Sequence, residues 1–335
     1  MVTRIKSPRA EQMRRKKKRR SRMTWMAVIL CGVVLYGASA LMDLLPVSEP
    51  ELNSGRTVQV YNMETGELMA LDLEQYIVGV VAAEMPAGFD IEALKAQAVA
   101  ARTFTVSRMI SPNPNVTALH SLAQLSTSPE TCQAWISEEE QKQRWGRQYK
   151  TYHRKIVQAV ADTAGEVLRY DGMLIEPLYH ASCGGGKTED ARYVWGNARP
   201  YLVSVDCNHP ADPHTQTRTS MTMQSMAQKL GLSGAVPAST SGDYMKLLSS
   251  TGTNRVQQIR IGGQTFTGSE LRSALNLKSS LISWNISGDE ITFITNGYGH
   301  GVGLCQYGAN YYAEQGNDYR QILSRYYTGA QLSRE

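Results

Sequence analysis

A run of twenty uncharged residues, 23–42, constrains this chain more than any other feature of its sequence. Such a run can cross a hydrocarbon core of about 30 Å as a helix. Eleven residues within 1–22 are lysine or arginine, and only Glu11 is acidic. Positive charge before an apolar span keeps that side in the cytoplasm. The sequence therefore predicts a basic cytoplasmic segment (1–22), one transmembrane helix (23–42) in the cell membrane, and an extracytoplasmic remainder.

A cleaved signal peptide is the alternative to an anchor. Ala38-Ser39-Ala40 has the small-x-small form of a cleavage site. We favour the uncleaved anchor because the apolar run continues past these residues to full spanning length. Both interpretations export the folded part of the chain.

The distribution of charge argues against nucleic acid as a partner. The chain has 35 basic and 30 acidic residues, a net charge of +5. The basic segment holds 11 of the former and one of the latter, which leaves 24 basic and 29 acidic residues beyond it. The folded part is therefore net acidic, whereas binding to phosphates requires a basic surface.

Beyond a Pro/Ser/Glu-containing linker, 43–56, the pattern predicts one α+β domain, 57–335. We expect mixed helices and antiparallel strands around a substrate cleft. The first expected elements are a hairpin in 57–71 and a helix from Leu73 to Glu84, which begins with a capping box of Asp72 and Gln75. A helix from Ile91 to about Met109, a loop at 110–135 and a helix around 148–163 follow. We then expect a hairpin turning at Asp171-Gly172, one helix within 216–245, several strands after 254, and a last helix near 318–329.

Glu84 stands out because it continues the apolar stripe of its helix. Leu73, Ile77 and Val80 precede it at helical spacing, and Pro86 prevents the helix from continuing. A carboxyl group at an apolar rim has a raised pKa and can act as a general acid, which cleavage of a glycosidic bond requires. The alternative is a structural glutamate that bonds to backbone amides or pairs with Lys95 or Arg102.

Glycines surround His300 in the segment GYGHGVG, residues 297–303, and let the backbone approach a ligand. A lone histidine is more often a hydrogen-bonded structural residue than a catalytic one. The segment lacks the Gly-Lys-Ser/Thr ending of a phosphate loop, and the chain contains neither Gly-x-Ser-x-Gly nor His-Glu-x-x-His. These patterns argue against a serine hydrolase and a standard zinc peptidase.

The exported part contains four cysteines: Cys132, Cys183, Cys207 and Cys305. An extracytoplasmic setting permits a disulfide, and Cys183 with Cys207 is the expected pair. The alternative is that all are small buried apolar residues.

Three separated blocks together resemble the stage II sporulation protein D family (SpoIID/LytB). They are YIVGVVAAEMPAGFDIEALKAQAVAARTF, YHASCGGGKTEDARYVWGNARPYLVSV and GYGHGVGLCQYGANYYAEQG, with RVQQIRIGGQTFTGSELRSALNLKSS similar to the connecting segment. The resemblance covers roughly residues 57 to 330. It implies a lytic transglycosylase that acts on peptidoglycan glycan strands whose stem peptides have been removed, with no cofactor.

The family's catalytic glutamate falls on Glu84. It would protonate the bond between N-acetylmuramic acid and N-acetylglucosamine, and then help the muramic acid 6-hydroxyl close on its own anomeric carbon. This intramolecular nucleophile makes the second carboxylate of a hydrolase unnecessary. The same blocks suggest further substrate-binding residues, each with a structural alternative: Lys95, Gln97, Arg102, Tyr179, His180, Ser182, His300, Gln306 and Tyr307.

The chain departs from the family in one loop. Sporulation members can hold zinc there through two histidines and two cysteines, whereas this chain keeps His120 and Cys132 but has Ser126 and Thr131 at the other positions. Structural zinc normally takes four ligands. We therefore predict no metal at this loop, with a rearranged site that uses Cys183 or Cys207 as the alternative.

The resemblance further implies a role in engulfment of the developing spore. The implied partners are stage II sporulation protein P, an amidase/endopeptidase that removes the peptides, and the membrane protein stage II sporulation protein M. The competing interpretation is a non-catalytic glycan-binding enhancer of an amidase, and a weaker one is an ordinary hydrolase.

Overall fold

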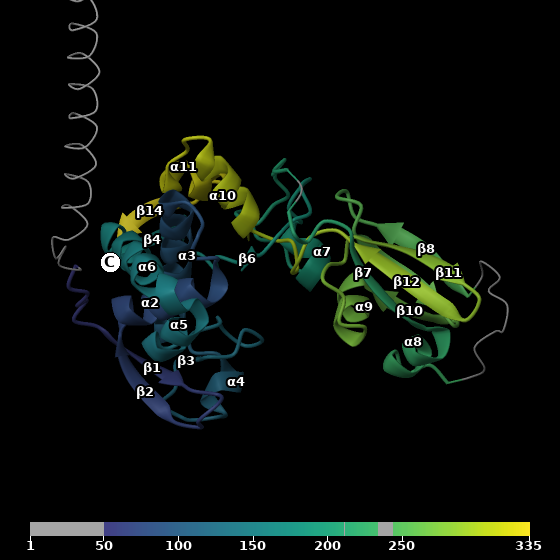
Figure 1. Cartoon of the computed structure of the whole chain (residues 1–335), viewed down its shortest axis with the longest axis horizontal. Coiled ribbons are helices and arrows are strands. Elements are labelled where there is room, and N and C mark those ends of the chain that lie inside the picture. Colours follow the sequence, from purple (N-terminus) through teal and green to yellow (C-terminus); the bar gives the residue numbers. More distant parts are fainter. Residues whose placement is uncertain (1–49, 211, 234–243) are drawn as a thin grey trace, which may run out of the picture. The chain divides into compact units, whose positions relative to one another are not determined.

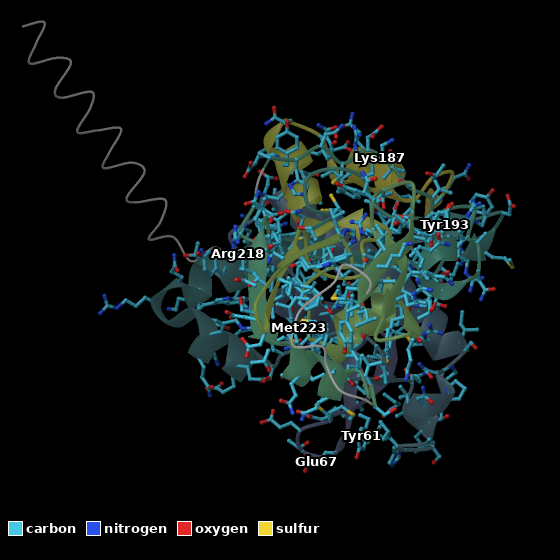
Figure 2. The ribbon with its side chains drawn as sticks, turned by 90° about the vertical axis from the view of Figure 1, so that its right-hand side faces the viewer. Tyr61, Glu67, Lys187, Tyr193, Arg218 and Met223 are labelled. Carbon is cyan, nitrogen blue, oxygen red and sulfur yellow. The ribbon has the colours of Figure 1, made fainter. Side chains whose placement is uncertain are left out.

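Helix α2 begins where a hairpin ends. Strands β1 (Thr57–Tyr61) and β2 (Leu68–Asp72) pair antiparallel, and β2 leads directly into α2 (Leu73–Glu84). Tyr61 and Glu67 flank the turn of this hairpin (Figure 2). Asp72 Oδ1 accepts the Glu74 backbone N–H at 2.8 Å, which confirms the predicted cap. The expected capping box is wrong, because the Gln75 side chain donates to the Leu52 carbonyl instead.

The computed structural model describes residues 50–210, 212–233 and 244–335. The predicted cytoplasmic segment and transmembrane helix lie outside these ranges, as do the first residues of the linker. Among the helices in these ranges, none combines the length and the apolar character that a membrane crossing requires.

Helix α3 (Ile91–Ile110) is the central element of the larger hydrophobic core (Figure 1). Asp90 caps it through the Glu92 N–H at 2.9 Å. Its alanines are buried and leave room for other elements to approach its backbone. It packs against α2, α6 (Tyr149–Asp162), β4 (Glu166–Tyr170), α10 (Gln306–Glu314) and α11 (Tyr319–Tyr326). The sequence predicted α3, α6 and α11.

Short strands join distant parts of the chain around this core. Strand β3 (Leu125–Ser126) adds to β1 in parallel, and β14 (Gln331–Arg334) and β5 (Met173–Leu174) flank β4. The β4–β5 turn falls at Asp171-Gly172, as predicted. Strand β6 (Tyr179–His180) pairs in parallel with β13 (Leu304–Cys305). The β6–β13 pair brings together two of the blocks that carry the family resemblance. The remaining helices here are α4 (Pro114–Thr117), α5 (Glu138–Trp145), a 3-10 turn (Gly146–Gln148) and α7 (Ala191–Trp195).

A second hydrophobic cluster lies between two antiparallel sheets and their helices. One sheet has the order β11 (Ile282–Ser287), β12 (Glu290–Thr295), β7 (Thr217–Thr222), and the other has β10 (Gln264–Thr267), β9 (Val256–Ile261), β8 (Met245–Ser250). Helices α8 (Met223–Lys229) and α9 (Gly268–Ala274) complete it. Ile291 and Phe293 of β12 are buried at the period of two that a strand requires. The expected α+β class is confirmed.

The segment predicted as one helix within 216–245 is different in the structure. Its first part, 217–222, forms strand β7, and the helix covers only Met223–Lys229. Half-buried and exposed residues alternate along β7, but its residues are mostly Ser and Thr, so their polarity does not show this alternation. Pairing with β12, more than 60 residues later, decides the strand conformation.

Candidate active site

Glu84 is the last residue of α2, and its carboxyl group is largely buried. Its Oε1 accepts the backbone N–H of Ala134 at 2.7 Å. Burial raises the pKa of Glu84 to about 7, while the hydrogen bond from Ala134 and the nearby Tyr179 hydroxyl oppose the shift. A substantial fraction of the side chain is therefore protonated near neutral pH. Neither Lys95 nor Arg102 pairs with it; their ion partners are other residues.

The loop after β3 covers Glu84, a role that the sequence did not indicate. The Ile136 N–H donates to the Gly79 carbonyl of α2 at 3.3 Å, and the Trp135 indole packs against Gly79. These contacts hold Ala134 where its N–H faces the carboxylate. Part of the desolvation at Glu84 thus comes from a segment about fifty residues further along the chain.

Substitution of Gly79 by alanine is expected to destabilise the protein, although alanine normally strengthens a helix by up to about 1 kcal/mol. A Cβ at position 79 would overlap the Trp135 indole and crowd the Ile136 carbonyl. We expect a loss of about 1–3 kcal/mol in the free energy of unfolding, typical of an overpacked core. The melting temperatures of Gly79→Ala and of the control Gly88→Ala measure this loss. A Cβ at position 88 meets open space, so the control should not be overpacked. Equal melting temperatures for the two variants would contradict it.

Tyr179, predicted to bind substrate, lies close to the carboxylate of Glu84. Its hydroxyl donates to Gln133 Oε1 at 2.8 Å, and Gln133 Nε2 donates to Thr105 Oγ1 at 3.2 Å. Burial and the charge of Glu84 raise the pKa of Tyr179 well above its ordinary value. Tyr179 therefore keeps its proton beside Glu84, and its O–H is held by Gln133 of the same covering loop.

Gln97 and Gln306 form a buried pair between α3 and α10. Gln306 Nε2 donates to Gln97 Oε1 at 3.2 Å, while Gln97 Nε2 has no hydrogen-bond partner among the described residues. Both side chains are almost inaccessible to solvent. The pair connects two of the sequence blocks, and the free amide N–H groups are donors that the protein leaves unused.

His300 is uncharged at neutral pH. Its Nδ1 accepts the Val302 N–H at 3.1 Å, and its ring lies edge-on to Trp195 with centroids 5.2 Å apart. Burial, together with the neighbouring His180, lowers the pKa of His300 to about 3. His180 donates from Nδ1 to the Val302 carbonyl, and its buried Nε2 has no hydrogen-bond partner within the described ranges. His300 is thus unsuited to the role of a general acid near neutral pH.

Aromatic rings extend from the segment that follows Glu84. Phe89 and Tyr307 pack edge to face with centroids 5.0 Å apart, His214 lies 5.4 Å from Tyr307, and Tyr298 lies 5.0 Å from His214. Tyr298 is exposed. Rings of this kind offer apolar faces to sugars. Of these rings, the sequence analysis named only Tyr307 as a substrate-binding residue. Phe89 lies in the same sequence block as Glu84 and could have been named, whereas no sequence pattern pointed to His214.

A pocket of about 310 Å³ lies beside the segments that carry Leu178 and Trp195. Its lining includes Leu178, which precedes Tyr179, and Trp195, which contacts His300. Glu84 is not among the residues that line it. The substrate cleft expected from the sequence stays a prediction.

Three of the residues predicted to bind substrate have structural partners instead. Arg102 is fully buried in an ion pair with Glu74, so it cannot reach a sugar. Lys95 pairs with Glu92 and Asp162, both at 2.9 Å. Ser182 is buried and its hydroxyl donates to Asp212. The resemblance marked these positions, but burial and pairing account for them without a ligand.

The loop with His120 and Cys132 does not fit a zinc ion. Ser126 Oγ and Thr131 Oγ1 lie 2.8 Å apart and hydrogen-bond to each other. His120 Nδ1 accepts the Leu122 N–H. Neutral hydroxyls that bond to each other do not replace a thiolate and an imidazole as zinc ligands.

The disulfide expected between Cys183 and Cys207 is wrong for this structure. The four cysteines of the described residues, Cys132 included, are free thiols. The sulfurs of Cys183 and Cys207 do lie within 4.8 Å of each other, but the sulfur of Cys305 also lies within 4.8 Å of both. Sequence spacing could not reveal this third sulfur, because pairing of β6 with β13 brings it from more than 100 residues away.

Comparison with known proteins agrees with the sequence blocks. The family model SpoIID, described as Stage II sporulation protein, matches residues 61–170. Stage II sporulation protein D of Bacillus subtilis (strain 168) is 40% identical over 281 residues, which is 83% of this chain and 79% of the relative. Stage II sporulation protein D of Bacillus amyloliquefaciens is 37% identical, over 85% and 81%. The amidase enhancer of B. subtilis (strain 168) is 29% identical, over 76% of this chain and 40% of that protein.

The chain belongs to the SpoIID family, as the sequence blocks predicted.

Proposed function

We propose that this protein is a lytic transglycosylase of peptidoglycan in which Glu84 acts first as acid and then as base. The observation that carries the proposal is the state of this carboxyl group. Burial raises its pKa to about 7, and Ala134 and Tyr179 orient it. An acid of this pKa can donate a proton and take one back near neutral pH.

The reaction requires no second carboxylate. Glu84 donates its proton to the glycosidic oxygen as the bond from that oxygen to C1 of the muramic acid breaks. The 6-hydroxyl oxygen of the same sugar bonds to C1, and its proton passes to the Glu84 carboxylate. The acid is thereby regenerated, and water is not consumed. Hydrolases use a second carboxylate to activate water or to attack C1. The groups that adjust the pKa of Glu84 are instead the Ala134 N–H and the Tyr179 hydroxyl, which suits a mechanism with a single carboxyl group.

The names of the relatives support a cell-wall role in sporulation. Two are stage II sporulation proteins D. We propose that the substrate is peptide-free glycan and that a membrane anchor at 23–42 keeps the domain extracytoplasmic. The proposed partners are the stage II sporulation protein P amidase/endopeptidase and stage II sporulation protein M. The name of the amidase enhancer favours a second candidate, a non-catalytic glycan-binding module.

Product analysis tests this function. The full chain in detergent is incubated with defined, peptide-free glycan strands, and the products are identified by mass spectrometry. We expect 1,6-anhydro-muramic ends that incorporate no ¹⁸O from labelled water, because the nucleophile is intramolecular. Reducing ends that carry ¹⁸O would show a hydrolase. Intact strands that nevertheless bind the protein would show a glycan-binding module.

A further inference from the structure

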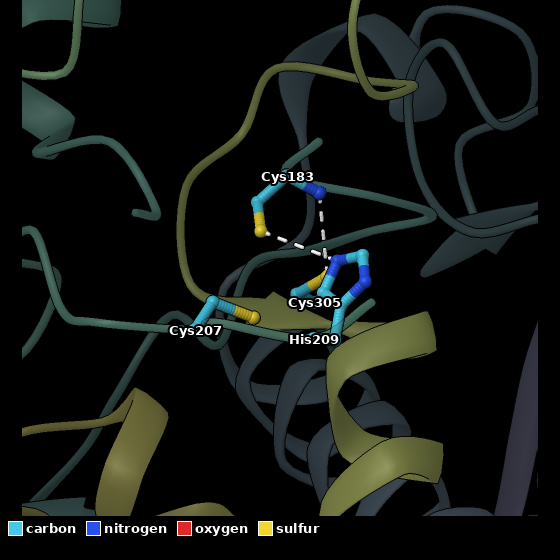
Figure 3. A group of neighbouring side chains, drawn as sticks. All are labelled: Cys183, Cys207, His209 and Cys305. Carbon is cyan, nitrogen blue, oxygen red and sulfur yellow. Dashed lines mark hydrogen bonds between the residues drawn. The ribbon is translucent and has the colours of Figure 1, made fainter. Parts of the chain in front are cut away.

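Three sulfurs and one imidazole nitrogen meet in the interior, away from the contacts of Glu84. Cys183, Cys207, His209 and Cys305 are all buried, and one ligand atom from each lies within 4.8 Å of every other (Figure 3). Cys183 follows β6, Cys305 ends β13, and the other two belong to the connection between α7 and β7. Three segments of the chain therefore converge on one point.

The separations between His209 and two of the sulfurs match those between ligands of a tetrahedral metal ion. His209 Nε2 lies 3.4 Å from Cys183 Sγ and 3.6 Å from Cys305 Sγ. Around Zn²⁺, with bonds of about 2.3 Å to sulfur and about 2.0 Å to nitrogen, tetrahedral angles place sulfur and nitrogen about 3.5 Å apart. Three cysteines and one histidine are also a common donor set of structural zinc sites.

The imidazole is already oriented for this role. His209 Nδ1 lies 2.8 Å from the Pro210 carbonyl, which can only accept, so Nδ1 carries the proton. In the neutral ring, Nε2 then presents its lone pair to the sulfurs. A ligand histidine typically donates its other N–H to a carbonyl or carboxylate in this way, which fixes the ring and its tautomer.

Hydrogen-bond donors surround the sulfurs. Cys305 Sγ accepts the N–H of Cys183 at 3.3 Å and that of Gly308 at 3.4 Å, and the Tyr326 hydroxyl lies 3.0 Å from Cys207 Sγ. Cys305 is the N-cap of α10, where the helix dipole favours negative charge. These features stabilise thiolates, the form of cysteine that binds metal.

Two further features fit a charged centre at this position. A Cβ at Gly308 would overlap both the Cys207 sulfur and the Tyr326 hydroxyl, so glycine is required for their approach. The Arg255 guanidinium is buried nearby and donates to the Cys183 carbonyl at 3.0 Å. Zn²⁺ with three thiolates has one net negative charge, and a buried arginine beside it compensates that charge.

We propose that Cys183, Cys207, His209 and Cys305 bind one structural Zn²⁺ ion. The site has four protein ligands and no position for substrate, as closed structural zinc sites do. It fixes the segments that carry Tyr179 and Gln306, and it differs in position and ligands from the loop with His120 and Cys132. The proposal does not depend on the proposed function.

Metal analysis of the full chain, purified in detergent without chelators, tests the site. We expect about one zinc ion per chain in the wild type and in Cys132→Ser, because a closed site has four ligands and Cys132 is not among them. Cys207→Ser and His209→Ala should lose most of the zinc. Cobalt in place of zinc should give thiolate-to-cobalt absorption in the first two proteins and not in the others.

Titration of the wild-type protein with a mercurial keeps the test independent of whether the variants fold. The zinc should be released as three thiols besides Cys31 and Cys132 are modified, since three cysteines bind it. A metal-free wild type, or a Cys183–Cys207 disulfide in a non-reducing peptide map, would overturn the proposal. So would zinc that is retained in Cys207→Ser but lost in His120→Ala.

Discussion

Replacement of Glu84 by glutamine is expected to lower the rate of glycan cleavage by about 10²- to 10⁴-fold, the usual contribution of a general acid. Glutamine keeps the shape of the side chain, and its carbonyl oxygen can still accept the Ala134 N–H. It cannot donate a proton of comparable acidity to a glycosidic oxygen. The measurement is the rate of release of anhydro ends from peptide-free glycan.

The matched control is Glu64→Gln in the exposed β1–β2 turn, which should cleave at the wild-type rate. Circular dichroism and the melting temperature establish that Glu84→Gln is folded. Wild-type activity in a folded Glu84→Gln variant would remove Glu84 from the chemistry. Glycan binding in this variant would remain, because the substitution changes neither shape nor the covering loop.

The pH profile of the wild type gives a second readout of the same carboxyl group. Burial raises the pKa of Glu84 from 4.5 to about 7, so the proton needed for the first step is present below pH 7 and is lost as the pH rises through it. We expect kcat/KM to fall about tenfold per pH unit above 7. A fall that begins near pH 4.5 would indicate a hydrated carboxyl and would contradict the buried position.

The second large effect is expected at Arg102, where Arg102→Met should cost about 3–5 kcal/mol in the free energy of unfolding. Arg102 Nε lies 2.8 Å from Glu74 Oε1, and Nη2 lies 2.7 Å from Oε2. Both residues are buried, and Arg102 also donates to the carbonyls of Val160 and Glu166. Methionine fills much of the volume but leaves the Glu74 carboxylate buried without its cation.

Chemical denaturation of the full chain in detergent measures this loss. The control Arg199→Met removes a largely exposed arginine that lies 3.6 Å from Glu176, and it should cost less than about 1 kcal/mol. The double variant Glu74→Gln/Arg102→Met should lose less free energy of unfolding than the two single variants lose in total, because no unpaired charge remains in it. Equal, small losses for Arg102→Met and Arg199→Met would show that the buried pair contributes little.

The position of Glu84 could be predicted because the signals are local. The helical spacing from Leu73 to Glu84 and the proline at 86 specify which face is buried and where the helix ends. The hairpin turn at Asp171-Gly172 was predictable for the same reason, since its residues favour positive φ. These elements depend on residues within a few positions of each other.

The environment of Glu84 could not be predicted in this way. Ala134 contacts it from a loop without periodicity, in which Trp135 packs against Gly79, and Tyr179 approaches it from β6. Arg102 looked like a substrate-binding residue because it shares a sequence block with Glu84, yet its partner Glu74 lies 28 positions away and both are buried. Burial of a charge depends on which elements pack over it, and a single sequence does not record that packing.

The sequence by itself determined the family, the α+β class and the place of Glu84 at the end of its helix, because periodicity, turn residues and motif blocks are properties of short segments. Tertiary structure alone decided the pKa of Glu84, the partners of Lys95, Arg102 and Ser182, and the meeting of Cys183, Cys207, His209 and Cys305. The physical reason is that desolvation and metal-ligand geometry arise from contacts between distant segments. Parallel pairing of β6 with β13 is one such contact, and it has no signature in either strand alone.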